Sequence, residues 1–267
     1  SSNHSSVDLH GTLEALAQRV FSDYELKRPV GYRLAWEILQ ERLTGLLGGV
    51  VERDCKELIQ SGYRPLAVEI DAKERLEGQW PAPLKGLTIL GRMDRIDYLA
   101  DKNHYRVIDY KYKSGPNRST EDNNLSRSAL RGKRLQPPFY LLLGKRFAAG
   151  RKKGAAEPTV ESAFYFLAPE WPTGPLVTEI FPADAWEGSL GAGLKETLSL
   201  LLEGIRQGRF FIHPGAHCDH CEVSELCRKN HLPTRWRAEN DPITEPHRDL
   251  RLKGLTKEVP NLAKKSR

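Results

Sequence analysis

Two aspartates and a lysine near the middle of the chain are the residues whose types and spacing could perform chemistry. Residues 91–113 read GRMDRIDYLADKNHYRVIDYKYK, a pattern that predicts two strands joined by a polar turn. Asp109 and Lys111 are two residues apart, so their side chains share a face of the second strand, and Asp94 is within reach across the hairpin. Carboxylates suit Mg²⁺ or Mn²⁺, and a lysine can stabilise charge on a phosphate or position water. The trio therefore predicts a metal site for phosphodiester hydrolysis.

A cross-strand ladder of salt bridges is the alternative interpretation of the same three residues, because sheets commonly pair opposite charges. Asp97 follows Asp94 by three positions, so the alternation along a strand places these two side chains on opposite faces. A further strand, predicted over residues 64–71, carries Glu69. We treat Glu69 as an additional catalytic acid, with an exposed carboxylate on an edge strand as the alternative.

The motif series resembles the RecB-type nucleases of the PD-(D/E)XK superfamily, which include the nuclease domains of RecB and AddB helicase–nucleases and their CRISPR-associated relatives. It consists of G-x-x-D-R-I-D at 91–97, D-Y-K at 109–111 and the pair Gln136 and Tyr140, within roughly residues 60 to 230. The resemblance implies a restriction-endonuclease-like core in which Asp94 and Asp109 hold the metal. It also implies that Gln136 and Tyr140 contact the nucleic acid beside that metal.

The same resemblance implies a DNA nuclease of repair or recombination, with exonuclease or end-processing action on single-stranded DNA. It implies a helicase partner or a larger parent chain as well. The first helix of this family usually begins G-T-L-x-H, with the histidine near the metal. Here the chain reads GTLEA, so Ala15 takes the place of that histidine. A catalytically degenerate DNA-binding module, or a structural subunit of a helicase–nuclease complex, is therefore the alternative function.

Four basic residues precede the Gln136–Tyr140 pair and could grip phosphates on the approach to the site, or could form a solvated helix face. They are Arg127, Arg131, Lys133 and Arg134. Pro137 and Pro138 favour the start of a new helix at this point. Without the resemblance, Gln136 and Tyr140 read as a helix cap and a core aromatic. We expect the polar segment 114–124 to cover a DNA strand.

Three cysteines near the C-terminus, Cys218, Cys221 and Cys227, have the spacing of metal ligands. Spacing alone leaves an iron–sulfur cluster and a zinc site equally open, because His213, His217, His220 and His231 lie nearby. The family resemblance favours [4Fe–4S], since AddB-like members carry such a triplet with a fourth cysteine far upstream.

The upstream cysteine of this chain is Cys55. In the family the first ligand precedes the G-T-L helix, whereas Cys55 follows it. Cys55 is therefore either the fourth ligand or an ordinary helix cysteine that packs as a small apolar side chain.

The 267-residue chain is long enough for one substantial core, and its net charge of +6 with a pI near 9.1 favours an anionic partner. Four cysteines are too few for a disulfide scaffold. No apolar run approaches a membrane span and no signal-peptide pattern is present, so we expect a cytoplasmic protein. Because the chain starts at Ser1, we expect a fragment or a processed product.

Apolar periodicity predicts helices at 12–27, 32–60 and 186–207, and strands at 159–167 and 176–181. This order predicts an α/β fold with a central mixed sheet flanked by helices. We divide the chain into an N-terminal helical region (1–62), a nuclease core (63–207), a cysteine-rich staple (208–232) and a loosely attached charged tail (233–267).

Overall fold

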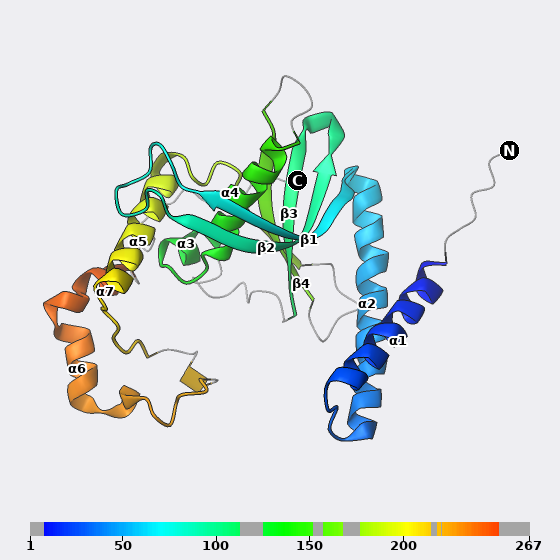
Figure 1. Ribbon diagram of the computed structural model, residues 1–267, viewed down its shortest axis with the longest axis horizontal. Helices are drawn as coiled ribbons and strands as arrows, with labels where there is room; N and C mark the ends of the chain where they lie inside the picture. The colour runs from blue at the N-terminus through cyan, green and yellow to red at the C-terminus, as the bar shows by residue number, and fades with distance from the viewer. Residues whose placement is uncertain are drawn as a thin grey trace.

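The computed structural model describes residues 8–112, 125–151, 157–167, 177–214, 218–219 and 221–250. A single five-stranded sheet has helices on both faces (Figure 1). The helices are α1 (Leu9–Lys27), α2 (Arg33–Ser61), α3 (Leu125–Leu130), α4 (Gln136–Ala149), α5 (Gly188–Arg206), α6 (Leu232–Asn240) and α7 (Glu245–Leu250), with 3₁₀ turns η1 (Ala100–Lys102), η4 (Arg228–Asn230) and η5 (Pro242–Thr244). The strands are β1 (Arg64–Arg75), β2 (Thr88–Leu99), β3 (His104–Lys111), β4 (Thr159–Phe166) and β5 (Val177–Phe181).

The strands lie in the order β1-β2-β3-β4-β5. All neighbours are antiparallel except β3 and β4, which run parallel, with Asp109 opposite Phe164 and Lys111 opposite Phe166. A parallel pair needs a crossover connection, and α3 and α4 lie in that connection. The prediction of an α/β fold with a mixed sheet flanked by helices is confirmed. The first strand is longer than predicted, because β1 keeps pairing with β2 as far as Arg75 opposite Thr88.

Local chemistry sets the ends of the N-terminal helices. The Asp8 carboxylate caps α1 by accepting the backbone N–H of Gly11 at 3.0 Å, which satisfies one of the free donors at a helix start. Gly62 ends α2 with a φ of +77°, a conformation that glycine adopts without strain, and donates its N–H to Leu58 O at 2.9 Å. Both helices lie where the sequence predicts them.

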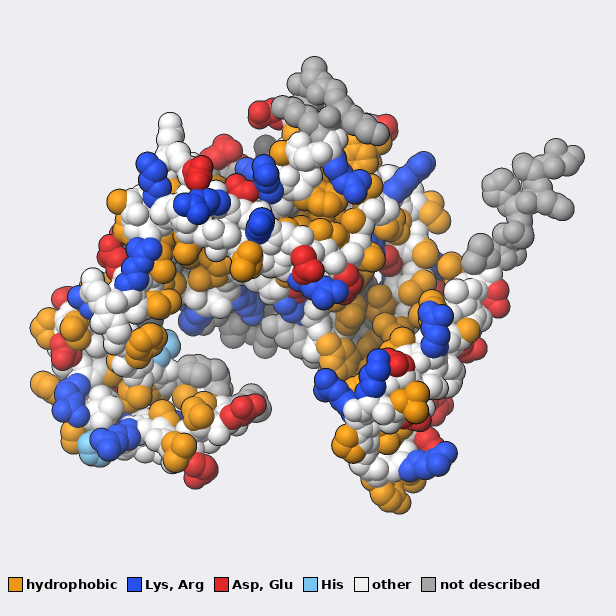
Figure 2. All heavy atoms as spheres, in the orientation of Figure 1, with side chains coloured by type: hydrophobic (Ala, Val, Ile, Leu, Met, Phe, Trp, Pro, Cys, Tyr) orange, Lys and Arg blue, Asp and Glu red, His pale blue; other side chains and the backbone are white. Residues whose placement is uncertain are grey.

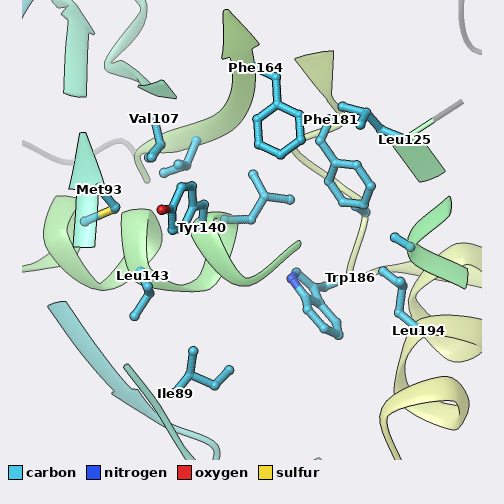
Figure 3. Close-up of a cluster of buried hydrophobic side chains, with 14 of the residues drawn as sticks. Ile89, Met93, Val107, Leu125, Tyr140, Leu143, Phe164, Phe181, Trp186 and Leu194 are labelled. Atoms are coloured by element: carbon cyan, nitrogen blue, oxygen red, sulfur yellow. The ribbon is translucent and has the colours of Figure 1, made fainter. Parts of the chain in front are cut away.

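The face of the sheet against α4 is apolar and holds the main core. Met93, Val107 and Phe164 come from three strands and meet Tyr140 and other side chains of α4 (Figure 3). Two glycines allow this close approach. A Cβ on Gly91 would lie 2.7 Å from Leu143 Cδ1, and a Cβ on Gly144 would lie 2.7 Å from Val107 Cγ2. The missing side chains therefore bring α4 close to the strands.

The opposite face of the sheet is held to α2 by charged side chains. Arg95 of β2, 6% exposed, forms an ion pair with Asp54 of α2 at 2.5 Å. Arg106 of β3 forms one with Glu57 of α2 at 3.2 Å. Apolar contacts on this side form two small clusters, Leu46 and Val50 of α2 against Leu167, and Ile108, Ala163 and Tyr165 with Tyr110 on the sheet. One face of the sheet thus holds the main core, and the other combines small apolar clusters with ion pairs to α2.

The segment after α5 contains more ordered structure than the predicted tail. Leu250 of α7 is 3% exposed where α7 contacts α5, and His247 meets the Phe211 ring at 5.1 Å. The apolar residues of this segment do not recur at helical spacing, so apolar periodicity did not predict its helices. The predicted DNA-covering segment 114–124 and the tail beyond residue 250 lie outside the described residues.

The surface drawn in Figure 2 mixes both signs of charge. Lys and Arg side chains alternate with Asp and Glu over the helices and strands visible there, so the net charge of +6 does not gather into one patch on that face. No helix among the described residues combines the length and the apolar character that a membrane crossing requires.

Candidate active site

The site begins where two strands separate. The pairing of β2 with β3 extends from Leu99 opposite His104 to Arg95 opposite Ile108 and stops there, while β2 continues alongside β1. Asp94 is the next residue of β2, and its Oδ2 accepts the backbone N–H of Tyr110 at 2.9 Å. A carboxylate therefore takes the place of the strand partner that Tyr110 has lost, and this contact fixes Asp94 beside Asp109.

Asp109 is the buried centre of the site, at 3% exposure. Its Oδ1 accepts a hydrogen bond from Gln136 Nε2 at 2.6 Å, and the ammonium group of Lys111 contacts its Oδ2. Burial raises the pKa of Asp109 and the Asp94 charge adds to that rise, while Lys111 opposes it. The predicted trio of Asp94, Asp109 and Lys111 is thus brought together in one place.

Gln136 links the charged groups to α4. Its Oε1 accepts from Lys111 Nζ at 2.8 Å, and its Nε2 donates both to Asp109 and to Tyr140 Oη, the latter at 2.7 Å. Gln136 is the first residue of α4, and Pro137 and Pro138 stand in the first turn, where a proline costs no helical hydrogen bond. The helix start predicted from the two prolines is where the structure has it.

Tyr140 closes the network from one turn further along α4. Its hydroxyl donates to the backbone carbonyl of Arg92 at 2.7 Å and lies 3.3 Å from Asp109 Oδ1. Burial is the main cause that raises the pKa of Tyr140 to about 12, so the hydroxyl remains a donor at neutral pH. Gln136 and Tyr140 therefore lie beside the carboxylates, as the motif series implied.

The carboxylates of Asp94 and Asp109 fit a hard divalent cation. Asp94 accepts one backbone N–H and Asp109 Oδ2 contacts the Lys111 ammonium, which leaves each carboxylate with further lone pairs for a cation. Elsewhere in the described residues, as here, no three His, Cys, Asp or Glu side chains converge into a complete ligand set. Mg²⁺ is commonly held by one or two carboxylates, with water and substrate phosphate completing its six positions. The carboxylates of Asp94 and Asp109 suit that pattern.

Glu69 lies across from Asp94 on β1 but is turned toward Arg92. The pairs on either side of it are Val68 opposite Arg95 and Ile70 opposite Met93. Its φ is +53°, which is unusual for a residue with a side chain. Its carboxylate pairs with Arg92 Nε at 2.7 Å, with both side chains about 60% exposed. Glu69 is thus near the site in register, with its carboxylate paired to the Arg92 side chain.

Arg127 lies in the short helix α3, and the other three basic residues lie in the turn that leads to α4. Lys133 is exposed, whereas Arg127, Arg131 and Arg134 are partly buried. Arg134 Nη1 lies 3.6 Å from Glu179 Oε2, so a neighbouring carboxylate offsets part of its charge. Of the four, Lys133 is the most exposed to solvent.

The cysteines are not brought together. Cys218 and Cys221 share one turn, in which Cys221 N donates to Cys218 O at 3.4 Å, and Cys227 N donates to Val223 O. The three side chains do not form a ligand group among the described residues, and His217 and His220 lie outside them. Figure 1 shows Cys55's helix, α2, on the other side of the molecule from this segment. Among the described residues of this segment, the ligands of a cluster or a zinc ion are not preassembled.

Ala15 is an exposed residue of α1, and the helix that α1 mainly contacts is α2. The position that corresponds to the family's histidine is therefore not placed against Asp94 or Asp109.

Sequence reasoning missed the part that Arg95 plays behind the site. Arg95 Nη1 donates to Tyr110 Oη at 2.9 Å, on the face opposite Asp109 and Lys111. The separation of Asp94 and Asp97 onto opposite faces agrees with this arrangement, because Asp97 is paired with Arg95 and is 1% exposed. An arginine and an aspartate at i and i+2 on a strand are the signal that could have predicted a charged, buried face.

Comparison with known proteins places the chain in a family. The sequence matches the family model described as "PD-(D/E)XK nuclease superfamily" over residues 4–228. A search of curated proteins finds no match. A solved structure described as "Crystal structure of SSO0001" is similar at 16% identity, covering 82% of this chain and 84% of that one, with a TM-score of 0.35. The match over most of the chain shows that the protein belongs to the PD-(D/E)XK nuclease superfamily.

Proposed function

We propose that this chain is a divalent-metal-dependent deoxyribonuclease that hydrolyses phosphodiester bonds. Its superfamily consists generally of nucleases, which typically use Mg²⁺ or Mn²⁺. The observation that carries the proposal is the convergence of Asp94, the buried Asp109 and Lys111, whose ammonium group contacts Asp109 Oδ2. A structural salt-bridge ladder would pair opposite charges, whereas here burial and the neighbouring charge of Asp94 both raise the pKa of Asp109, so two carboxylates are held next to each other.

Asp94 and Asp109 would hold the metal, whose chemistry is to activate water and to neutralise charge on the phosphate. Lys111 Nζ, held by Gln136 Oε1, is oriented to stabilise the developing negative charge or to position the attacking water. Gln136 and Tyr140 keep Asp109 fixed and would position the DNA strand beside the metal. Single-stranded or end-processing cleavage, in DNA repair or recombination, is proposed on the family resemblance alone.

Cleavage of a labelled DNA strand tests this proposal. Pure protein is incubated with single-stranded and duplex DNA in Mg²⁺, in Mn²⁺ and in chelator, and products are resolved by length. We expect cleavage with either metal and none with chelator. Asp109→Ala and Lys111→Ala should each abolish cleavage with the fold retained. Undiminished cleavage by both variants would contradict the site assignment.

A DNA-binding module without catalysis is the second candidate, and Ala15 is the observation that favours it. Residue 15 is exposed on α1 and carries no group that could assist a metal. This candidate predicts that the pure protein retains labelled DNA in Mg²⁺ and Mn²⁺ but leaves its length unchanged. A helicase partner or a larger parent chain is proposed with either function. The exposed apolar residues of the α1–α2 hairpin, such as Leu26 at 86% and Tyr32 at 76%, suit a protein partner.

We also propose that Cys218, Cys221 and Cys227 hold a structural [4Fe–4S] cluster, with zinc as the competing occupant. The spacing supports this proposal, whereas the side-chain positions do not form a ligand set. Anaerobically purified protein should be brown and contain about four irons per chain. Cys221→Ala should remove the colour. Cys55→Ala separates the two possibilities for the fourth ligand: lost colour supports Cys55, and retained colour rejects it. Colourless protein with one zinc per chain would refute the cluster.

A further inference from the structure

Tyr110 lies between two residues of the proposed active site and is held at both ends. It is flanked by Asp109 and Lys111, and its backbone N–H donates to Asp94 Oδ2 at 2.9 Å. Its side chain points to the other face of the sheet, where its hydroxyl accepts from Arg95 Nη1 at 2.9 Å. Arg95 directly follows Asp94, so two consecutive residues of β2 hold Tyr110, one through its backbone N–H and the other through its hydroxyl.

Arg95 is itself locked in place. Asp97 accepts from its Nε and Nη2, both at 2.6 Å, and Asp54 of α2 accepts from its Nη1 at 2.5 Å. Such a planar fork fixes the guanidinium in orientation as well as in position. Burial opposes the charge, but the hydrogen bonds that Arg95 donates to Asp97 and Asp54 raise the pKa of Arg95 well above its usual value.

We propose that Arg95 is a positioning residue for the metal site, and that Asp54 couples helix α2 to that site through it. This proposal rests on the proposed function. The contacts run from Asp54 to Arg95, from Arg95 to Tyr110, and through the Tyr110 backbone to Asp94. Outer contacts of this kind orient metal-binding carboxylates, and their loss weakens metal binding without removing a ligand.

The chain contains a matched network that meets the Arg95 network where the Tyr165 ring packs edge-on against Tyr110, with ring centroids 6.1 Å apart. Arg106 of β3 donates to Glu161 at 2.6 Å and to Glu57 of α2 at 3.2 Å. The hydroxyl of Tyr165 on β4 lies 3.4 Å from Arg106 Nη1 and donates to Glu57 at 3.2 Å. Both networks join α2 to the same face of the sheet through an arginine and a tyrosine. Among the described residues, the Arg106 network makes no hydrogen bond or ion pair to Asp94, Asp109 or Lys111, and Tyr165→Phe keeps the ring that packs against Tyr110.

The experiment compares isosteric variants of the two networks in the full chain. Tyr110→Phe and Asp54→Asn alter the Arg95 network, while Tyr165→Phe and Glu57→Gln alter the Arg106 network. For each, we would measure the unfolding temperature, the Kd for Mn²⁺ by electron paramagnetic resonance, and kcat and KM on labelled single-stranded DNA.

We expect Tyr110→Phe and Asp54→Asn to raise the Mn²⁺ Kd and to lower kcat by about tenfold, with KM for DNA unchanged. Tyr165→Phe and Glu57→Gln should leave both quantities within about twofold of wild type, at a similar loss of unfolding temperature. Equal effects in the two pairs would overturn the proposal and leave a merely structural role.

The outcomes also separate this inference from the proposed function. A wild-type protein that binds Mn²⁺ but cuts no DNA refutes the nuclease, while the Mn²⁺ comparison still decides the role of Arg95. A wild-type protein that neither binds Mn²⁺ nor cuts DNA refutes both.

Discussion

Asp94 accepts the backbone N–H of Tyr110 at 2.9 Å, one residue beyond the point where β2 and β3 stop pairing. The Asp94 carboxylate therefore has two roles. It accepts a backbone N–H of β3 that no longer pairs with β2, and it lies beside Asp109. These two roles respond differently to substitution.

Asp94→Asn should keep the fold and lose the activity. The amide oxygen still accepts the N–H of Tyr110, whereas the charge for a cation is gone. Asp94→Ala should lose activity and also about 1 kcal/mol of stability, because the N–H loses its acceptor. Urea unfolding and a cleavage assay in Mg²⁺ measure the two effects. Equal stability of the two variants would show that the hydrogen bond to Tyr110 carries no weight.

Glu69→Gly should stabilise the protein by up to about 1 kcal/mol, because glycine adopts a φ of +53° without strain. The exposed pair with Arg92 offsets little of this gain. Asn103→Gly, at a φ of +46°, is the control away from the site. If Glu69 is a catalytic acid, Glu69→Gly alone should lose cleavage as it gains stability. Full cleavage by this variant would remove Glu69 from the site.

Gly144→Ala should destabilise the protein by about 1–3 kcal/mol, since its Cβ would lie 2.7 Å from Val107 and 2.8 Å from Val160. Gly45→Ala in α2 is the matched control. No atom lies within 4 Å of a Cβ there, so the better helix propensity of alanine should add about 0.5–1 kcal/mol. Thermal or urea unfolding checks both. A stabilising Gly144→Ala would mean that α4 lies further from the sheet.

Lys133→Gln should weaken DNA binding to a similar extent for every sequence, and should reduce the salt slope by about 0.7 for single-stranded DNA. Arg134→Gln should have a smaller effect, because Glu179 lies 3.6 Å from Arg134. Arg33→Gln, at an exposed ion pair on α2, is the control. Binding is followed by fluorescence anisotropy between low and moderate salt. An unchanged salt slope after replacing all four predicted basic residues would show that they form a solvated surface and do not contact phosphates.

Acid should destabilise the fold through His104. Burial lowers the pKa of His104, although the charge of Glu161 opposes that shift in part. The unfolded chain takes up a proton on this histidine below about pH 6.5, and the folded chain resists doing so. Stability is therefore greatest above that pH and falls as the pH drops below it. Urea unfolding at several pH values should show a shallower decline in His104→Gln, and an identical decline would contradict this source.

The sequence could predict most helices and strands, and it could predict which side chains share the face of Asp109 and Lys111. Apolar periodicity located α2 and α5, and strand alternation placed Asp109 and Lys111 on one face. The Gln136–Tyr140 spacing gave their common helix face. Each of these features depends on neighbours within a few residues, so a local pattern contains the information.

The parts that sequence could not predict depend on docking between distant elements. Arg95 and Asp54 are 41 residues apart in the sequence, and no local pattern around either residue predicts their contact. The burial of Leu250 depends on α5 in the same way. The positive φ of Glu69 arises within a strand whose sequence looks regular.

The contributions of the two faces of the sheet to stability should change differently as temperature rises. Apolar packing against α4 strengthens only up to a plateau as temperature rises, while the cost of dehydrating charged groups keeps falling. The ionic contacts of Arg95 and Arg106 with α2 therefore carry a growing share of the cohesion in hot solution. In a version of this protein adapted to heat, α2 would be the helix whose attachment needed the least reinforcement.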